Sequence, residues 1–202
     1  IEACDRLGYE TVLGVSLADR TSLAARRAGH VVVLGGPQSR DSYLSVPAVL
    51  HAAIETGCTA LHPGYGFLSE SPQFARACRE AGIVFIGPSP ESMAALGDKV
   101  RSKELASQAN VPVVPSSSVC ERTGEEAKGF GADLGYPLLV KAAAGGGGRG
   151  MRLVTDPTDL APAMESAQRE AAAAFGDGRG FLESYIPRPR HVGFQILADH
   201  HG

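Results

Sequence analysis

The sequence predicts an α/β fold arranged in two units, and three observations support this prediction. Short apolar runs alternate with helix-like stretches over the first 88 residues, which is typical of βαβ units with a parallel sheet. Glycines follow directly after the predicted helices of this part. After Gly87 and Pro88 the pattern changes to two successive helices and then to mixed strands and helices. The expected order is a parallel α/β unit, a helical connector and a second, α+β unit.

Four strands and three helices are predicted in the first unit. The strands are expected at 11–15, 30–34, 59–62 and 84–86, and the helices at 21–28, 46–56 and 72–81. Gly29, Gly57 and Gly82 each follow one of these helices, where a left-handed residue is favoured at the C-terminus. The apolar run Val31 to Leu34 is expected to form a buried strand. The sequence begins at Ile1 inside a helix-like stretch, so the first strand of the sheet is expected to be missing.

The second unit is predicted to begin after the connector helices at 89–96 and 99–110. An extended segment at 112–115 and a helix at 124–134 follow. The remaining prediction is a strand at 137–142, a strand at 151–155, a helix at 158–175, and strands at 180–186 and 191–198.

Composition excludes several classes of protein. With 44% hydrophobic residues, 20% charged residues and a net charge of −3, the chain reads as globular rather than disordered or collagen-like. A pI near 6.1 argues against nucleic-acid binding, because such domains usually have a pI above about 9. No apolar run approaches the roughly 18 residues of a membrane span. The four cysteines lack zinc-ligand spacing, so we expect no metal site and free thiols in the cytoplasm.

The most informative segment is the glycine-rich stretch at 141–151. Four consecutive glycines, at 145–148, lie between a strand that ends in Lys141 and a strand that begins at Met151, which predicts a β-hairpin tip. Glycines in such a loop let backbone amides approach a ligand closely. Walker and dinucleotide loops open a helix instead, so neither pattern fits. Lys141 and Arg149 could neutralise phosphate charge, and a flexible linker is the alternative interpretation.

Four further segments are ordered along the chain: residues 62–70 (HPGYGFLSE), 85–88, 97–99 and 189–192 with Gln195. Together with the glycine-rich stretch they resemble the biotin carboxylases, whose nucleotide site lies in an ATP-grasp fold. The glycine-rich stretch resembles the lid loop of that fold, and residues 62–70 resemble a motif of the family's N-terminal domain. The five segments cover nearly the whole chain.

The resemblance implies a Rossmann-like pre-ATP-grasp domain at 1–97, without its first strand, and the N-terminal part of an ATP-grasp domain at 98–202. The lid subdomain is expected at about 112–186. The positions implied to bind ATP are Lys99, Lys141, Gly146, Gly147, Gly148, Glu183, Ile186 and His191.

From the residues alone, these positions have simpler interpretations. Lys99 reads as an exposed lysine at a helix start, Glu183 as a charge on an edge strand, and His191 as a histidine in a proline-rich turn. His62, Tyr65 and Glu70 read as a structural turn in which Gly64 takes a positive φ. For these last three we expect a structural role together with active-site lining.

The chain departs from the family pattern at three positions. Ala144 replaces a glycine, which is expected to stiffen the lid. Ser184 replaces a residue that is often basic, so backbone contacts are expected beside the adenine. Gly193 replaces an acidic residue, which removes a carboxylate from the floor of the site.

The activity implied by the resemblance is that of an ATP-dependent ligase. The parent enzyme would use MgATP and bicarbonate to carboxylate biotin on a carrier protein, within an acyl-CoA carboxylase of fatty acid metabolism. The metal-binding carboxylates and the catalytic arginine are expected beyond the position of Gly202, so the chain holds no catalytic or metal residue and is expected to be inactive alone. A biotin carboxyl carrier, a carboxyltransferase and a second copy in a homodimer are the expected partners.

The sequence alone leaves two alternatives open. One is another ATP-grasp ligase of the carbamoyl-phosphate synthetase type, against which the motif at 62–70 argues. The other is a non-catalytic nucleotide-binding module.

Overall fold

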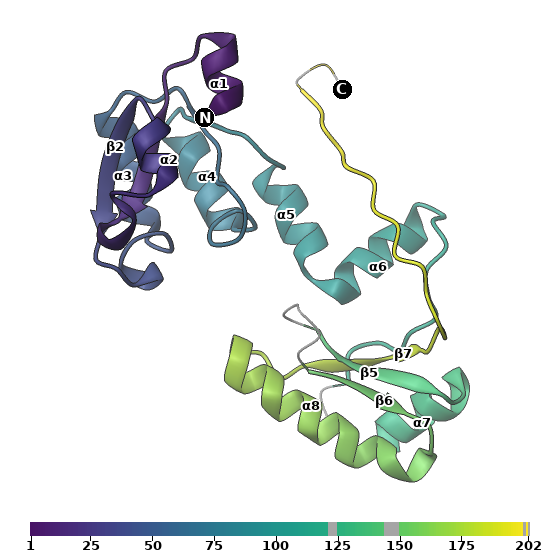
Figure 1. Cartoon of the computed structure of the whole chain (residues 1–202). Helices are drawn as coiled ribbons and strands as arrows, with labels where there is room; N and C mark the ends of the chain where they lie inside the picture. The colour runs from purple at the N-terminus through teal and green to yellow at the C-terminus, as the bar shows by residue number, and fades with distance from the viewer. Residues whose placement is uncertain (121–124, 144–149, 200, 202) are drawn as a thin grey trace. The chain divides into compact units, whose positions relative to one another are not determined.

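The structure is a computed structural model that describes residues 1–120, 125–143, 150–199 and 201. The chain divides into two compact units, residues 1–97 and 98–202 (Figure 1). Each unit has its own hydrophobic core. Among the described residues, no helix combines the length and the apolar character that a membrane span requires.

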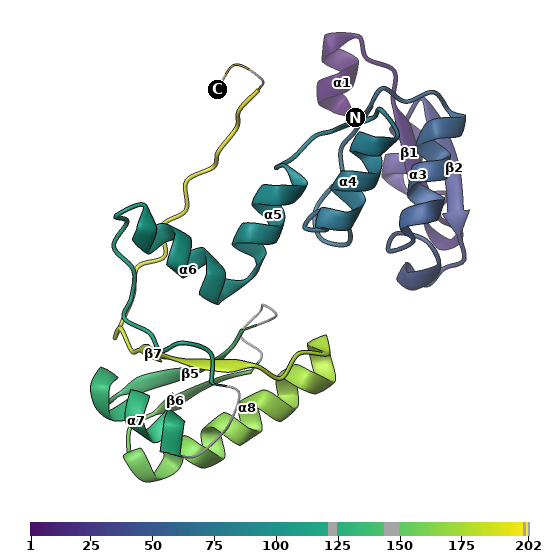
Figure 2. The same cartoon turned by 180° about the vertical axis from the view of Figure 1, so that it is seen from behind.

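Parallel strand pairs form the sheets of the first unit. Strand β1 (Val12–Ser16) pairs with β2 (His30–Gly35), and the two lie side by side in Figure 2. Strand β3 (Ala60–Leu61) pairs with β4 (Val84–Phe85). The predicted strands and their parallel direction are confirmed. The described hydrogen bonds join them into two separate two-stranded sheets rather than one.

Short helices connect these strands, and serine side chains cap three of them. Ser22, Ser45 and Ser71 each accept a hydrogen bond from the backbone amide three residues later, which satisfies one of the free N–H groups of a helix start. The helical segments of the unit are α1 (Glu2–Leu7), η1 (Leu17–Asp19), α2 (Leu23–Arg27), η2 (Ser39–Asp41), α3 (Val46–Glu55), α4 (Pro72–Glu80) and α5 (Pro90–Gly97).

Two of the three predicted C-terminal glycines behave as expected. Gly57 and Gly82 have φ angles of 68° and 73°, in the left-handed region. The prediction for Gly29 is wrong, because α2 ends at Arg27 and the next residue is extended. Gly29 instead lies against the chain before β1, where a Cβ atom would be 3.1 Å from the carbonyl oxygen of Thr11.

Residues 31–34 form a strand as predicted, but the prediction that this strand is buried is wrong. Val31 and Val33 are 39% and 47% exposed. Successive side chains of a strand point to opposite faces, and α3 packs against β2. Alternate valines of this short two-stranded sheet therefore remain exposed.

The core of the first unit is built on the inner face of α4. Phe74 and Cys78 of this helix are fully buried against Ala53 of α3, Leu68 and Ile83. The Phe74 and Phe85 rings meet edge to face with centroids 5.9 Å apart. This packing holds the segment 62–71, which leads into α4.

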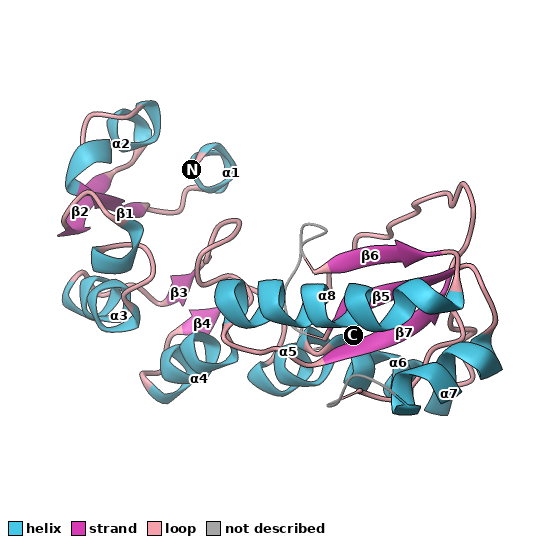
Figure 3. Ribbon diagram, turned by 90° about the horizontal axis from the view of Figure 1, so that it is seen from below, coloured by secondary structure: helices cyan, strands magenta, loops and turns pink. Residues whose placement is uncertain are grey.

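The second unit contains a three-stranded antiparallel sheet. Strand β5 (Leu138–Ala142) lies in the centre, between β6 (Met151–Val154) and β7 (Gly180–Ser184). Its helical segments are α6 (Lys99–Gln108), α7 (Glu125–Leu134), η3 (Pro157–Asp159) and α8 (Leu160–Phe175). Helix α8 lies across one face of the sheet (Figure 3). The predicted pairing of 137–142 with 151–155 as a hairpin is confirmed by the register Lys141↔Met151.

Strand alternation separates the two faces of this sheet. Leu138 and Val140 of β5 and Leu182 of β7 are fully buried and pack with Leu160 and Met164 of α8. The residues between them, among them Lys141 and Glu183, belong to the other face.

The strand predicted at 191–198 is wrong. This segment has no regular secondary structure in the described residues, and its side chains are exposed. A strand is stable only when it pairs with a neighbour, and none of the described residues pairs with this segment.

Candidate functional site

The face of the second unit's sheet that lies opposite α8 carries the polar residues of interest. The register pairs Lys141 with Phe181 and Leu139 with Glu183. Directly paired residues point to the same face, so Lys141 and Glu183 are diagonal neighbours on it. A lysine and a glutamate separated by 42 residues in sequence are therefore brought together by strand pairing.

Glu183 lies at the centre of this cluster. Its side chain is 9% exposed, and its two carboxylate oxygens pair with different lysines, Oε1 with Lys141 and Oε2 with Lys103. Burial raises the pKa of the Glu183 carboxyl, but the hydrogen bonds from the two lysines outweigh it and hold the pKa below its usual value. Glu183 does lie on an edge strand, β7, as the simpler interpretation stated, but its charge is nearly buried and paired with two lysines.

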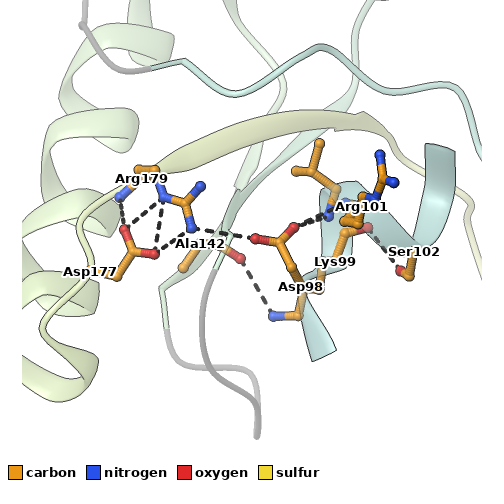
Figure 4. A network of polar contacts seen from close by, with 8 residues as sticks. Asp98, Lys99, Arg101, Ser102, Ala142, Asp177 and Arg179 are labelled. Carbon is orange, nitrogen blue, oxygen red and sulfur yellow. Dashed lines mark hydrogen bonds and ion pairs between the residues drawn. The ribbon is translucent and has the colours of Figure 1, made fainter. Parts of the chain in front are cut away.

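Lys99 reaches the same region from the first turn of α6. Its Nζ donates to the carbonyl oxygen of Ala142 at 3.4 Å (Figure 4). Burial and the neighbouring charge of Lys141 lower the pKa of Lys99, against the opposing attraction of Glu183. Lys99 is thus a partly buried amine near a second amine, rather than an exposed lysine at a helix start.

Asp98 fixes the start of α6 and therefore the position of Lys99. Its Oδ1 accepts hydrogen bonds from the backbone amides of Val100 and Arg101, both at 2.9 Å. Its Oδ2 is 3.3 Å from Nη2 of Arg179, which Asp177 also holds through two carboxylate oxygens (Figure 4). This network ties the helix start to the chain just before β7. The Arg179 interactions also lower the pKa of Asp177.

The cluster of three lysines and one glutamate has a net positive charge. Glu183 neutralises one of the three positive charges of Lys99, Lys103 and Lys141, so two positive charges remain. Amines of this kind bind phosphate oxygens through charge-assisted hydrogen bonds. The arrangement is therefore chemically suited to an anionic ligand.

Of the other residues expected at an ATP site, Ile186 and His191 belong to the described part of the chain. Gly146, Gly147 and Gly148, together with Ala144, lie outside the described residues. Ile186 is 48% exposed just after β7, and His191 is exposed in the segment without regular structure. In the described part of the chain, the structure brings Lys99, Lys141 and Glu183 together and adds neither Ile186 nor His191 to their hydrogen bonds.

Lys103 was missed in the sequence analysis. It lies four residues after Lys99, so the two side chains share one face of α6. This spacing was a usable signal, but it did not indicate that a buried carboxylate lies opposite that face.

The motif at 62–70 forms a tight loop in the first unit. Nδ1 of His62 accepts a hydrogen bond from the amide of Gly64 at 3.0 Å, and Gly64 has the predicted positive φ, 74°. Phe67 stacks on Tyr43 with ring centroids 4.9 Å apart, while Tyr65 is 99% exposed. The structural part of the expectation is confirmed, and active-site lining stays a prediction.

Within residues 1–120, 125–143, 150–199 and 201, no three His, Cys, Asp or Glu side chains form a group that could hold a metal ion. The ionic chemistry of the described site is that of lysines around one carboxylate.

Comparison with known proteins extends over both units. Residues 1–93 match the family described as biotin carboxylase, N-terminal domain, and residues 98–202 match the family described as carbamoyl-phosphate synthase L chain, ATP binding domain. A biotin carboxylase from Nostoc sp. is 45% identical over 202 residues, which is 100% of this chain and 45% of the relative.

Solved structures give the same relationship. A Campylobacter jejuni biotin carboxylase, described as a β-γ-ATP complex, superposes with a TM-score of 0.89 at 42% identity, over 94% of this chain and 42% of that one. The biotin carboxylase domain dimer of Hydrogenobacter thermophilus 2-oxoglutarate carboxylase, with MgADP, ADP and bicarbonate, has a TM-score of 0.86 at 42% identity, over 92% and 41% of the two chains.

These relatives define the fold and the family. The chain spans less than half of their length. The first unit corresponds to the Rossmann-like domain expected before an ATP-grasp domain, and the second to part of the ATP-grasp domain itself. The chain therefore belongs to the biotin carboxylase family and comprises its N-terminal domain together with sequence of the ATP-binding domain.

Proposed function

We propose that this chain supplies the part of a biotin carboxylase that binds the phosphates of ATP. The observation that carries the proposal is that the amines of Lys99, from α6, and Lys141 lie near the buried Glu183, and that Lys141 is on β5, the strand that leads into the glycine-rich segment. Both amines retain hydrogen-bond donors for a ligand. The ATP and ADP complexes of the two solved relatives support the same conclusion.

The roles of the individual residues follow from this proposal. Lys99 and Lys141 bind phosphate oxygens, and Gly146, Gly147 and Gly148 close over them. Glu183 and Ile186 lie at the adenine and ribose end, with the Glu183 carboxylate beside the amine of Lys141, and His191 reaches the ribose or phosphate region. The exposure of Ile186 leaves its apolar side chain free to contact a base. The domain limits of 1–97 and 98–202, with a lid subdomain at about 112–186, belong to the same proposal.

The described residues fit a phosphate but not Mg²⁺. Their lysines would repel a cation, and they contain no group of metal-ligating side chains. We therefore assign no metal-dependent step to them. Their contribution is to bind and orient the nucleotide and to keep its charge balanced in a partly buried site.

For the whole protein we propose the activity of an ATP-dependent ligase. ATP supplies the phosphoryl group that activates bicarbonate, and the carboxyl group is then passed to biotin. The biotin is carried by a carrier domain or protein, and a carboxyltransferase and a second copy of the chain complete the assembly. The dimer of the Hydrogenobacter relative supports the last point. Four cysteines without disulfides agree with the reducing cytoplasm.

The first unit separates this proposal from its enzymatic alternative. The family that matches residues 98–202 is described for carbamoyl-phosphate synthase, but residues 1–93 match the N-terminal domain of biotin carboxylase. The observation therefore favours biotin carboxylation over carbamoyl-phosphate synthesis.

The test is an assay of the native protein that carries this sequence. We expect ATP hydrolysis that depends on bicarbonate and biotin, with transfer of labelled bicarbonate carbon to biotin. Lys99→Met and Lys141→Met are expected to raise the KM for ATP, whereas Arg101→Met, which removes an exposed charge from the same helix, is the matched control. Nucleotide binding without bicarbonate-dependent hydrolysis would instead support a non-catalytic module.

A further inference from the structure

Lys103 is held by the protein more completely than the other two lysines of the site. Its Nζ donates to the carbonyl oxygen of Val114 at 3.0 Å, pairs with Oε2 of Glu183, and lies 5.7 Å from the centre of the Phe181 ring. These partners belong to two different segments, the chain after α6 and strand β7. The amine of Lys103 is therefore engaged by the protein and poorly placed to serve a ligand.

Lys141 differs in this respect. In the described part of the chain, Glu183 is the only hydrogen-bond or ion-pair partner of its Nζ. A phosphate oxygen could therefore replace Glu183 as its partner. That exchange would leave a nearly buried carboxylate without a counter-ion unless another cation stays with it, and a buried unpaired charge is costly.

We propose that Lys103 is a positioning residue that keeps Glu183 paired while Lys141 exchanges the carboxylate for a phosphate of the nucleotide. The inference rests on the proposed nucleotide site and extends it to a third lysine of the cluster. Lys103 carries charge to the carboxylate and not to the ligand. Without it, Lys141 becomes the main counter-ion of Glu183 and is harder to release.

The first experiment uses inorganic tripolyphosphate, because this probe has no base or ribose and reports the phosphate contacts alone. Its affinity is measured by calorimetry for the 202-residue chain and for Lys103→Met, Glu183→Gln and the double variant. We expect Lys103→Met to weaken binding about tenfold, equivalent to ~1.4 kcal/mol. Addition of Glu183→Gln is expected to restore most of this loss, because no carboxylate then retains Lys141.

Two control variants distinguish a positioning role of Lys103 from a general effect of positive charge and from an effect on packing. Lys103→Arg keeps the charge at the site and is expected to bind nearly as wild type does. Arg101→Met removes a positive charge from the same helix, where Arg101 pairs only with Glu104 in the described structure, and is expected to change affinity little. If Lys103→Met has no effect, or if the double variant is as weak as Lys103→Met, the proposal is wrong.

The second experiment needs no variant and remains informative if Lys103→Met fails to fold. Acetylation of each lysine by acetic anhydride is followed by mass spectrometry with and without tripolyphosphate. We expect the phosphate to protect Lys141 and Lys99 and to leave the reactivity of Lys103 unchanged. Equal protection of Lys103 would show that it contacts the ligand directly, which would overturn the proposal.

The same labelling distinguishes failure of this inference from failure of the nucleotide site. If the wild-type chain binds neither tripolyphosphate nor ATP, the proposed site is wrong for this chain. The pairing of Glu183 with both Lys103 and Lys141 can still be tested without a ligand. Lys103→Met should slow the acetylation of Lys141 several-fold, because Glu183 then pairs with Lys141 alone. Glu183→Gln should speed the acetylation of Lys141, because it removes the carboxylate that holds this amine. An unchanged rate in both variants would contradict the sharing itself.

Discussion

Lys141 of β5 and Glu183 of β7 form an ion pair across the diagonal of one antiparallel strand pairing, on the face of the sheet that α8 leaves uncovered. The Glu183 side chain is 9% exposed, whereas the Lys141 side chain is 26% exposed. The pair thus has an inner anion and an outer cation. In the proposed function, this asymmetry makes Lys141 the member of the pair that meets the phosphate.

The Glu183 carboxylate is expected to make the free energy of unfolding depend on pH. Its folded pKa lies below its usual value, so its pairing stabilises the fold fully above the unfolded pKa of about 4.3 and loses that contribution as the pH falls through the folded pKa. Urea titrations followed by circular dichroism should show wild type losing more stability than Glu183→Gln between neutral and strongly acidic pH. Parallel losses in the two proteins would contradict this.

The core beneath the site is expected to be sensitive to truncation. Leu138 is fully buried in the cluster that joins the sheet to α8, so Leu138→Ala should lower the free energy of unfolding by about 3 kcal/mol. The matched control is Val192→Ala, at a position that is 63% exposed, where the change should stay within about 0.5 kcal/mol. Similar costs at the two positions, measured by urea titration, would argue against the described packing.

Asp98 is expected to stabilise the first turn of α6 through its side chain. Asp98→Ala removes both amide contacts and should destabilise this turn by about 1 kcal/mol, whereas Asp98→Asn keeps an accepting oxygen and should cost less. Hydrogen exchange of the Val100 and Arg101 amides measures the effect locally. Equal exchange rates in the two variants would show that the pair with Arg179, rather than the cap, holds the helix start.

The loop at 62–70 is expected to depend on the stacking of Phe67 on Tyr43. Phe67→Leu removes the stacked ring and should speed cleavage by chymotrypsin after the exposed Tyr65. Tyr43→Phe keeps the ring and loses only the hydroxyl that donates to Asp19 and accepts from the Ser16 amide, so the loop should be affected less. The order of cleavage rates in limited proteolysis tests this. Faster cleavage in Tyr43→Phe would mean that the hydroxyl, not the stacking, holds the loop.

Local patterns predicted most elements because those elements depend on local signals. The helix at 72–81 and the strands at 137–142 and 151–155 have caps, apolar spacing or a hairpin loop in the sequence itself. The segment 191–198 has an equally strong apolar alternation but no pairing partner in the described chain, so no strand forms. The exposure of Val31 and Val33 has the same origin, because burial depends on what covers a strand.

In the candidate site, too, the sequence indicated some features, whereas others depend on tertiary structure. The positions of Lys99, Lys141 and Glu183 followed from the family resemblance, but their contacts depend on the register between β5 and β7. Nothing local to Glu183 indicates that it is buried or that it binds two lysines. Lys103 was missed for that reason, although its spacing from Lys99 was visible in the sequence.

The most direct test of the nucleotide site is the response of the 202-residue chain to MgATP in amide NMR spectra. We expect weak, saturable shifts at Lys99, Lys141, Ala142 and Glu183, and we expect Lys99→Met with Lys141→Met to abolish them while Arg101→Met leaves them unchanged. Saturable shifts that persist when both lysines are replaced, or shifts confined to the first unit, would contradict the assignment of this cluster as the phosphate-binding site.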